Sequence, residues 1–183
     1  IQDLQVTLDA GSCSSRIVFN VDKAHTAGLE AELGWSPMDG LDLTFAASVL
    51  EAKFDSTVRD GTNAVIGGIQ DGNRLPSVPE LQLSAAGTYR WSPGWTDADA
   101  FVSGSVQHIG DRYTQPSDQL PTQGLPAATG LALGALTGLE SPRDLVDLNL
   151  GAYTTLNVSA GLEFEDWSLT LYVNNLTDED AEL

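Results

Sequence analysis

Apolar and polar residues alternate along most of this chain. The alternation predicts about seven β-strands, at residues 4–8, 27–35, 41–49, 81–91, 100–110, 153–164 and 167–174. In segment 41–49, for example, Leu41, Leu43 and Phe45 alternate with Asp42 and Thr44. Because successive side chains of a strand point to opposite faces, each predicted strand has one apolar face and one polar face.

The connections between the predicted strands alternate in length. Short turns are predicted at 36–40, 92–99 and 165–166, and long connections at about 55–78 and 115–149. This rhythm is typical of an antiparallel up-and-down meander with tight turns at one end and elaborate loops at the other. Several predicted strands are also longer than the roughly 5–6 residues usual in globular proteins. Their length suits a tilted strand that crosses a bilayer, which needs about 9–11 residues.

The two faces of the predicted strands leave two folds open. In a transmembrane barrel the apolar face meets lipid, and the polar face, with residues such as Glu30, Glu32 and Gln82, lines a watery lumen. In a soluble sandwich the apolar face is turned inward instead. The tryptophans that flank the short turns favour the barrel, because aromatic girdles mark the two membrane interfaces; they are Trp35, Trp91, Trp95 and Trp167.

Composition and charge exclude several classes of function. The formal net charge of -18, from 26 acidic and 8 basic residues, argues against nucleic acid as a partner, since phosphate binding needs a basic patch. A single cysteine, Cys13, permits no intramolecular disulfide and no zinc framework. His25 and His108 show no metal-ligand spacing. No nucleophile–base pair or phosphate loop occurs either, so we expect no enzyme, no cofactor and no metal site.

Four stretches carry a family resemblance. They are "FNVDKAHTAGLEAELGWSPMDGLDLTFAASVLEAKF" (19–54), "GNRLPSVPELQLSAAGTYRW" (72–91), "HIGDRYTQ" (108–115) and "YTTLNVSAGLEFEDWSLTLYVNNLTDEDAEL" (153–183). In this order they resemble the barrel domain of TonB-dependent outer-membrane receptors. The resemblance covers nearly the whole chain. It implies that residues 1–183 form a single segment of the carboxy-terminal part of a larger transmembrane β-barrel, in the outer membrane of a Gram-negative bacterium.

The resemblance also implies a function and a set of partners. Such receptors carry out ligand-gated active uptake of a scarce small molecule, usually a ferric siderophore, with a vitamin, haem or a glycan as alternatives. The implied partners are the outer-membrane bilayer and the TonB complex, the latter through an amino-terminal part that this sequence lacks, together with the plug. The sequence starts at Ile1 and stops at Leu183, before the family's last strand. We therefore expect a partial barrel that is incomplete at both ends.

Three residues are candidates for ligand binding. Arg74 lies in the "RLPSVP" stretch before a predicted strand, and Arg112 and Tyr113 follow a strand's outer end beside the longest loop. A guanidinium and a ring there could contact an anionic cargo. The structural alternatives are a strand start punctuated by prolines for Arg74, and anchoring of the rim for Arg112 and Tyr113.

Two other functions stay open from the sequence alone. The Asp-rich stretches "TDADA" (96–100) and "LTDEDAEL" (176–183) suit a soluble, acidic β-sandwich that binds carbohydrate or Ca²⁺, because hard cations prefer carboxylates. A passive porin would share the barrel pattern without the plug.

Overall fold

The computed structural model describes residues 1–9, 16–119 and 149–181. These residues form an all-β fold, as the alternation predicts, with one short 3-10 helix. No described helix is long and apolar enough to cross a membrane. The elements are β1 (Gln2–Asp9), β2 (Arg16–Met38), β3 (Leu41–Phe54), β4 (Leu81–Trp91), β5 (Asp99–Ile109), β6 (Arg112–Tyr113), η1 (Pro116–Gln119), β7 (Asn149–Leu150), β8 (Tyr153–Glu163) and β9 (Ser168–Val173).

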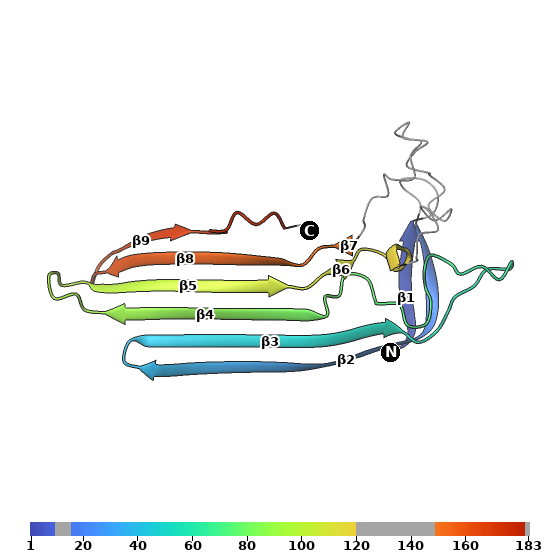
Figure 1. Cartoon of the computed structure of the whole chain (residues 1–183), viewed down its shortest axis with the longest axis horizontal. Helices are drawn as coiled ribbons and strands as arrows, with labels where there is room; N and C mark the ends of the chain where they lie inside the picture. The colour runs from blue at the N-terminus through green and yellow to red at the C-terminus, as the bar shows by residue number, and fades with distance from the viewer. Residues whose placement is uncertain (10–15, 120–148, 182–183) are drawn as a thin grey trace, which may run out of the picture. The chain divides into compact units, whose positions relative to one another are not determined.

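The strands pair with their neighbours along the chain, as an up-and-down meander requires (Figure 1). The hydrogen-bonded order is β1-β2-β3-β4-β5-β8-β9, and β6 pairs with β7 separately. The pairings from β3 to β9 are antiparallel. The order has two free ends, so the sheet of the described residues is not closed. This confirms the prediction of a partial barrel.

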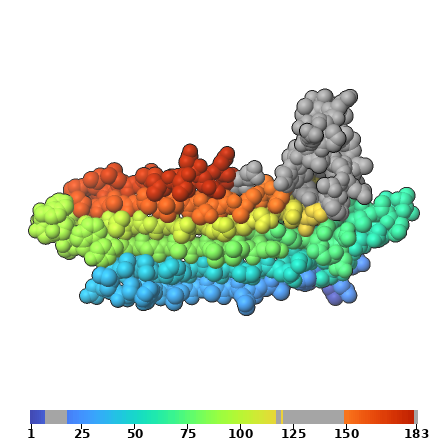
Figure 2. All heavy atoms as spheres, in the orientation of Figure 1, coloured from blue at the N-terminus to red at the C-terminus, as the bar shows by residue number. Residues whose placement is uncertain are grey.

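The chain divides into two compact units. The strand unit comprises Gly28–Val49, Pro79–Asp111 and Gly151–Leu183. Its strands lie side by side in chain order (Figure 2). The loop unit comprises Ile1–Ala27, Leu50–Val78 and Arg112–Leu150. Strands β2 and β3 run from one unit into the other.

The register of the strand unit keeps like side chains together. Phe45 is opposite Ala85, Ala85 is opposite Val106, and Val106 is opposite Leu156. One residue further along, the row reads Ala46, Ser84, Gln107 and Thr155. Because the period of a strand is two, this register sorts the alternation of four separate strands, β3, β4, β5 and β8, onto the same two faces.

The short connections of the strand unit lie at one end of its strands, at the left of Figure 1. The turn predicted at 36–40 is shorter in the structure and consists of Asp39-Gly40, because β2 continues to Met38. Gly40 has φ +78°, and a Cβ there would collide with the backbone oxygen of Arg90. An Asp-Gly pair is a strong signal for a two-residue hairpin, since glycine adopts positive φ without strain.

The prediction for β2 was too short at its start. The alternation indicates a strand from residue 27, whereas β2 begins at Arg16 and its first part pairs with β1. Val21 and Ala24 are both buried, although they are three residues apart. A buried pair at this spacing interrupts the period of two, so the pattern did not show this part of the strand.

The turn after β9 is fixed to β8. The backbone N–H of Asn175 donates to Oδ1 of Asn157 at 2.9 Å, and the N–H of Leu176 donates to the carbonyl of Leu156 at 2.7 Å. Asn175 has φ +50°, a conformation that asparagine tolerates better than most residues. The Asn-Leu-Thr-Asp stretch therefore ends the strand with a turn that a β8 side chain holds in place.

The loop unit has a small hydrophobic core. It consists of Val6, Val21, Ala24, Phe54 and Ile69, packed against partly buried neighbours. The segment after β3 folds onto this core, because Val58 donates its N–H to the carbonyl of Ile69 at 3.0 Å. In the described part of the strand unit, the buried apolar residues are Ala98 and Ala100. The larger apolar side chains of the strand unit are therefore not packed in a core.

This contrast predicts different losses of stability for a Phe→Ala substitution at two positions of β3. Phe54→Ala should destabilise the loop unit by about 3–5 kcal/mol, the usual cost of deleting a buried phenylalanine side chain. Phe45→Ala, on the exposed face of the same strand, should cost much less. Limited proteolysis of segment 55–80 in the full-length protein measures the difference. Equal sensitivity of the two variants would contradict the assignment of the core.

Candidate functional site

The strand unit exposes a broad apolar face. Leu29 is 82% exposed, Leu33 59%, Phe45 42% and Leu83 42%. Other exposed members of this face are Trp35, Val49, Tyr89, Trp91, Val102, Val106, Leu169, Leu171 and Val173. A soluble sandwich would cover such a face with a second sheet, whereas these described side chains are exposed. A patch of this extent marks a surface that meets a protein partner or a membrane.

The dimensions of the apolar face suit a bilayer. Along β3 its side chains run from Leu41 to Val49, which at about 3.3 Å per residue is roughly 27 Å of strand. Tilted by about 40°, that length corresponds to an apolar band of roughly 20 Å or more once side chains are added, near the ~25 Å of outer-membrane barrels.

Aromatic rings gather at the short-turn end of this band. Tyr89 stacks on Trp91 with ring centroids 5.4 Å apart, and Phe164 stacks on Trp167 at 4.0 Å. Trp35 and Trp95 are also exposed there. The structure thus places all four tryptophans at the short-turn end, where an interfacial girdle would lie.

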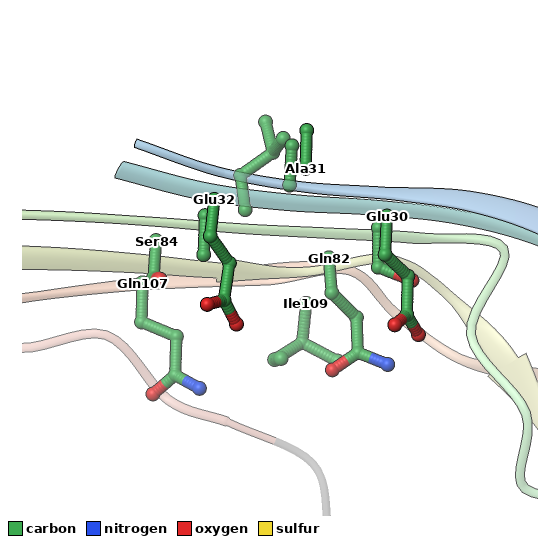
Figure 3. Close-up of a pocket in the computed structure, with 11 residues that line it drawn as sticks. Glu30, Ala31, Glu32, Gln82, Ser84, Gln107 and Ile109 are labelled. Atoms are coloured by element: carbon green, nitrogen blue, oxygen red, sulfur yellow. The ribbon is translucent and has the colours of Figure 1, made fainter. Parts of the chain in front are cut away.

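The opposite face of the strand unit is polar. Figure 3 shows Glu30, Glu32, Gln82 and Gln107 extending to the same side, and Ala31 to the other. They line a shallow pocket of about 240 Å³ together with Ser48 and Ser84, among others. Carboxylates, amides and hydroxyls on one wall can hydrogen-bond to water or to a polar partner, but they form no reactive pair.

Hydroxyl and amide groups continue across this polar face. Thr88 and Ser103 share a hydrogen bond of 2.8 Å between their hydroxyls, and the amide of Asn157 donates to Ser105 at 3.4 Å. Near the short turns, Ser36 donates to Asp42 at 2.7 Å. Cross-strand pairs of this kind stabilise a sheet modestly while leaving its surface wet.

Two of the predicted ligand-binding residues lie together in the loop unit. The guanidinium carbon of Arg74 lies 5.3 Å from the centre of the Tyr113 ring, a cation–π geometry. Arg74 also donates from Nη2 to the carbonyl of Val78 at 3.3 Å. The backbone of Tyr113 accepts from the N–H of Ser77 at 2.7 Å. Arg74 and Tyr113 therefore join the lead-in to β4 to the segment after β5.

The backbone of Arg74 is held by a distant side chain. Its N–H donates to Oε1 of Gln119 at 2.7 Å, and its carbonyl accepts from Nε2 of Gln119 at 2.8 Å. Arg112 lies in β6, where it pairs with Leu150 of β7. Both arginines are half-buried. These contacts support the structural interpretation of Arg74 as a strand-start residue. Ligand contact by Arg74, Arg112 and Tyr113 stays a prediction.

The structure also assembles a charged cluster that the sequence did not reveal. His25 of β2 contacts Asp55 through Nδ1 at 2.6 Å and Glu51 through Nε2 at 3.2 Å, and Lys53 contacts Glu51 at 2.6 Å. His25 is 26 positions from Glu51 and 30 positions from Asp55 in the chain, so no local motif joins it to them. Among the described residues, no group of three or more histidine, cysteine or acidic side chains could hold a metal ion.

A loop carboxylate outside the strands is held by its own turn. Oδ1 of Asp60 accepts from the hydroxyl and the N–H of Thr62, at 2.7 and 2.8 Å, and from the N–H of Ala64. The hydrogen bond from the Thr62 hydroxyl, followed by those from the two N–H groups, lowers the pKa of Asp60. Asp60 therefore shapes the tip of the 55–80 loop and stays ionised.

Comparison with known proteins agrees with this two-faced sheet. The family model described as TonB dependent receptor-like, beta-barrel, matches residues 1–176. Among solved structures, the ferric yersiniabactin uptake receptor FyuA from Yersinia pestis matches with a TM-score of 0.63 and 21% identity. The match covers 97% of this chain and 21% of that chain, so the sequence spans about a fifth of that receptor. At this identity the likeness to FyuA concerns the fold.

Neighbouring residues on β4 provide a test of the two faces. Leu83→Lys puts a charge on the apolar face, between the centre of the band and its end, because Leu83 is opposite Ala47. It should cost about 1–3 kcal/mol of stability in a bilayer, since the cost of a lysine falls from about 2–4 kcal/mol at the midplane of outer-membrane barrels to about 0–1 kcal/mol near the interfaces. Ser84→Lys puts the same charge on the polar face and should cost little. Unfolding in lipid vesicles measures both. A larger penalty at Ser84 than at Leu83 would reverse the assignment of the faces.

Proposed function

Because the chain belongs to the TonB-dependent receptor β-barrel family, we propose that it forms barrel wall and outer loops of a ligand-gated receptor for active uptake. Proteins of this family reside in the outer membrane and are transporters rather than enzymes. The observation that carries the proposal is the pair of faces on the strand unit. One face is apolar and exposed along the strands, and the other is polar.

In this proposal each face has its own task. The apolar face holds the wall in lipid, where the paired strands satisfy one another's backbone groups. The polar face lines the aqueous lumen. The long connections of the loop unit form part of the surface that meets cargo, since loops on a rigid scaffold are the usual place for binding residues. Energy for uptake comes from the TonB complex, through parts of the receptor outside residues 1–183.

We further propose that the cargo is a ferric siderophore or a similarly scarce small molecule. The support is a structural neighbour, FyuA, which is named as the receptor for ferric yersiniabactin uptake. Within the loop unit, Arg74, Arg112 and Tyr113 are the candidates to contact an anionic cargo. Arg74 and Tyr113 would act as one unit, because the ring fixes the guanidinium.

Uptake with and without an energy source tests the proposed class of transporter. The full-length receptor, expressed in cells that lack their own receptors, should accumulate a radiolabelled ferric siderophore from a panel. An uncoupler of the proton gradient, or loss of TonB, should abolish accumulation. Uptake that persists under both treatments would instead indicate a passive porin. Energy-dependent uptake of a vitamin or haem, with no response to any siderophore, would keep the class and change the cargo.

A single arginine tests the proposed ligand contact. Arg112→Ala should weaken binding of an anionic ferric siderophore about tenfold or more, in the range expected for a lost hydrogen bond to a charged group. Arg90→Ala, an exposed arginine near the short turns, is the matched control and should bind normally. Fluorescence quenching on the purified full-length receptor gives both dissociation constants. Unchanged binding by the Arg112 variant would leave it with the rim-anchoring role.

A further inference from the structure

The His25 cluster joins three pieces of the loop unit. His25 lies on β2, Glu51 and Lys53 lie on β3, and Asp55 is the first residue after β3. The imidazole meets Asp55 at 2.6 Å through Nδ1 and Glu51 at 3.2 Å through Nε2. One ring therefore bridges a strand, its neighbour and the root of the loop that follows.

Hydrogen-bond stoichiometry fixes the charge of the ring in this arrangement. A neutral imidazole has one N–H donor and one acceptor nitrogen, whereas the imidazolium has two donors. An ionised carboxylate can only accept. Two carboxylates facing the two ring nitrogens are therefore both satisfied only when His25 is protonated.

The cluster lies where the loop root is also tied by the backbone. The N–H of Asp55 donates to the carbonyl of Lys23 at 3.0 Å, and Ser56 Oγ lies 3.3 Å from the same carbonyl. The N–H of Lys23 in turn donates to Ser56 at 3.2 Å. A change at the His25–Asp55 contact thus acts directly on the point where the 55–80 loop leaves the sheet.

We propose that His25 is a proton-operated clamp, which when protonated holds the root of the 55–80 loop against β2 and β3. When the proton is lost, one ring nitrogen faces a carboxylate without a hydrogen between them. That contact becomes repulsive, and the loop root opens more often. This clamp is independent of the cargo and of the energy source.

Charge and position fit the clamp. The charged groups around the ring are Glu51, Lys53 and Asp55, with Lys23 two residues earlier on β2. All four clustered side chains are partly exposed, so a proton reaches the ring freely. The outward apolar residues of β3 end at Val49, which leaves the cluster outside the membrane-spanning segments.

The direction in which pH affects the clamp follows from the change in the pKa of His25. The hydrogen bond to Glu51, followed by that to Asp55, raises the pKa of His25 above its usual 6.5. The hydrogen bonds to Lys53 and then to His25 lower the pKa of Glu51. Because the pKa of His25 is higher in the folded protein than in the unfolded chain, protonated His25 contributes its full stabilisation below about pH 6.5. That stabilisation is lost as the pH rises through the pKa of His25 in the folded protein. The loop root should therefore be tighter in acid and looser in mildly alkaline solution.

Hydrogen exchange on the full-length receptor tests the clamp. Protection of a peptide covering residues 52–58, corrected for the intrinsic pH dependence of exchange, should fall roughly two- to fivefold between pH 5.5 and 8.5, as suits one exposed ionic contact. His25→Gln should show the lower protection at both pH values. Glu51→Gln should move the midpoint to lower pH, because it removes the largest cause of the raised pKa.

A second histidine supplies the matched control. The ring of His108 on β5 forms a hydrogen bond of 2.8 Å with a neutral hydroxyl, that of Thr154. His108→Gln should keep the wild-type pH dependence at residues 52–58. The clamp is overturned if wild-type protection there does not change with pH, or if His25→Gln retains the change. It is also overturned if His108→Gln abolishes the change.

Discussion

The register between antiparallel strands is the constraint on which the rest of this structure depends. From β3 to β9, each strand is paired so that residues of one parity share one face. A slip of one residue in any pair would turn apolar side chains into the lumen and polar ones into lipid. Both errors are costly, because a charge in the bilayer and an unsatisfied polar group in hydrocarbon each cost several kcal/mol. The membrane thus enforces the register that the alternation encodes.

The same constraint explains where the chain has a core and where it does not. In the strand unit, lipid takes the role of the hydrophobic interior, so Leu29, Leu33 and Leu171 can stay exposed. In the loop unit, apolar residues cover one another instead, which removes their side chains from water. Phe54 and Ile69 accordingly reach zero exposure there. Strand β3, which has 14 residues, begins with exposed apolar side chains in the strand unit and ends in the hydrophobic core of the loop unit.

An open sheet in a bilayer requires further strands. The two edges of the described sheet present backbone groups that lipid cannot satisfy, and only closure removes edges. The chain matches a fifth of the length of FyuA, which suits a section of wall. The charged His25 cluster, the Arg74–Tyr113 pair and the Gln119 contacts all lie in the loop unit. The strand unit therefore supplies the scaffold, and these side-chain contacts join distant segments of the loop unit.

Alternation along the sequence was enough to predict the all-β class, the two faces and most of the strands. β4 runs from Leu81 to Trp91 as predicted, because alternation is a local signal that survives wherever a strand has one apolar and one polar side. The start of β2 could not be predicted in this way, since Val21 and Ala24 pack in a core whose members lie far apart in the chain. Only the tertiary structure decided which charged residues meet. His25 and Asp55 are 30 positions apart, and a contact of that kind depends on pairing geometry rather than on local pattern.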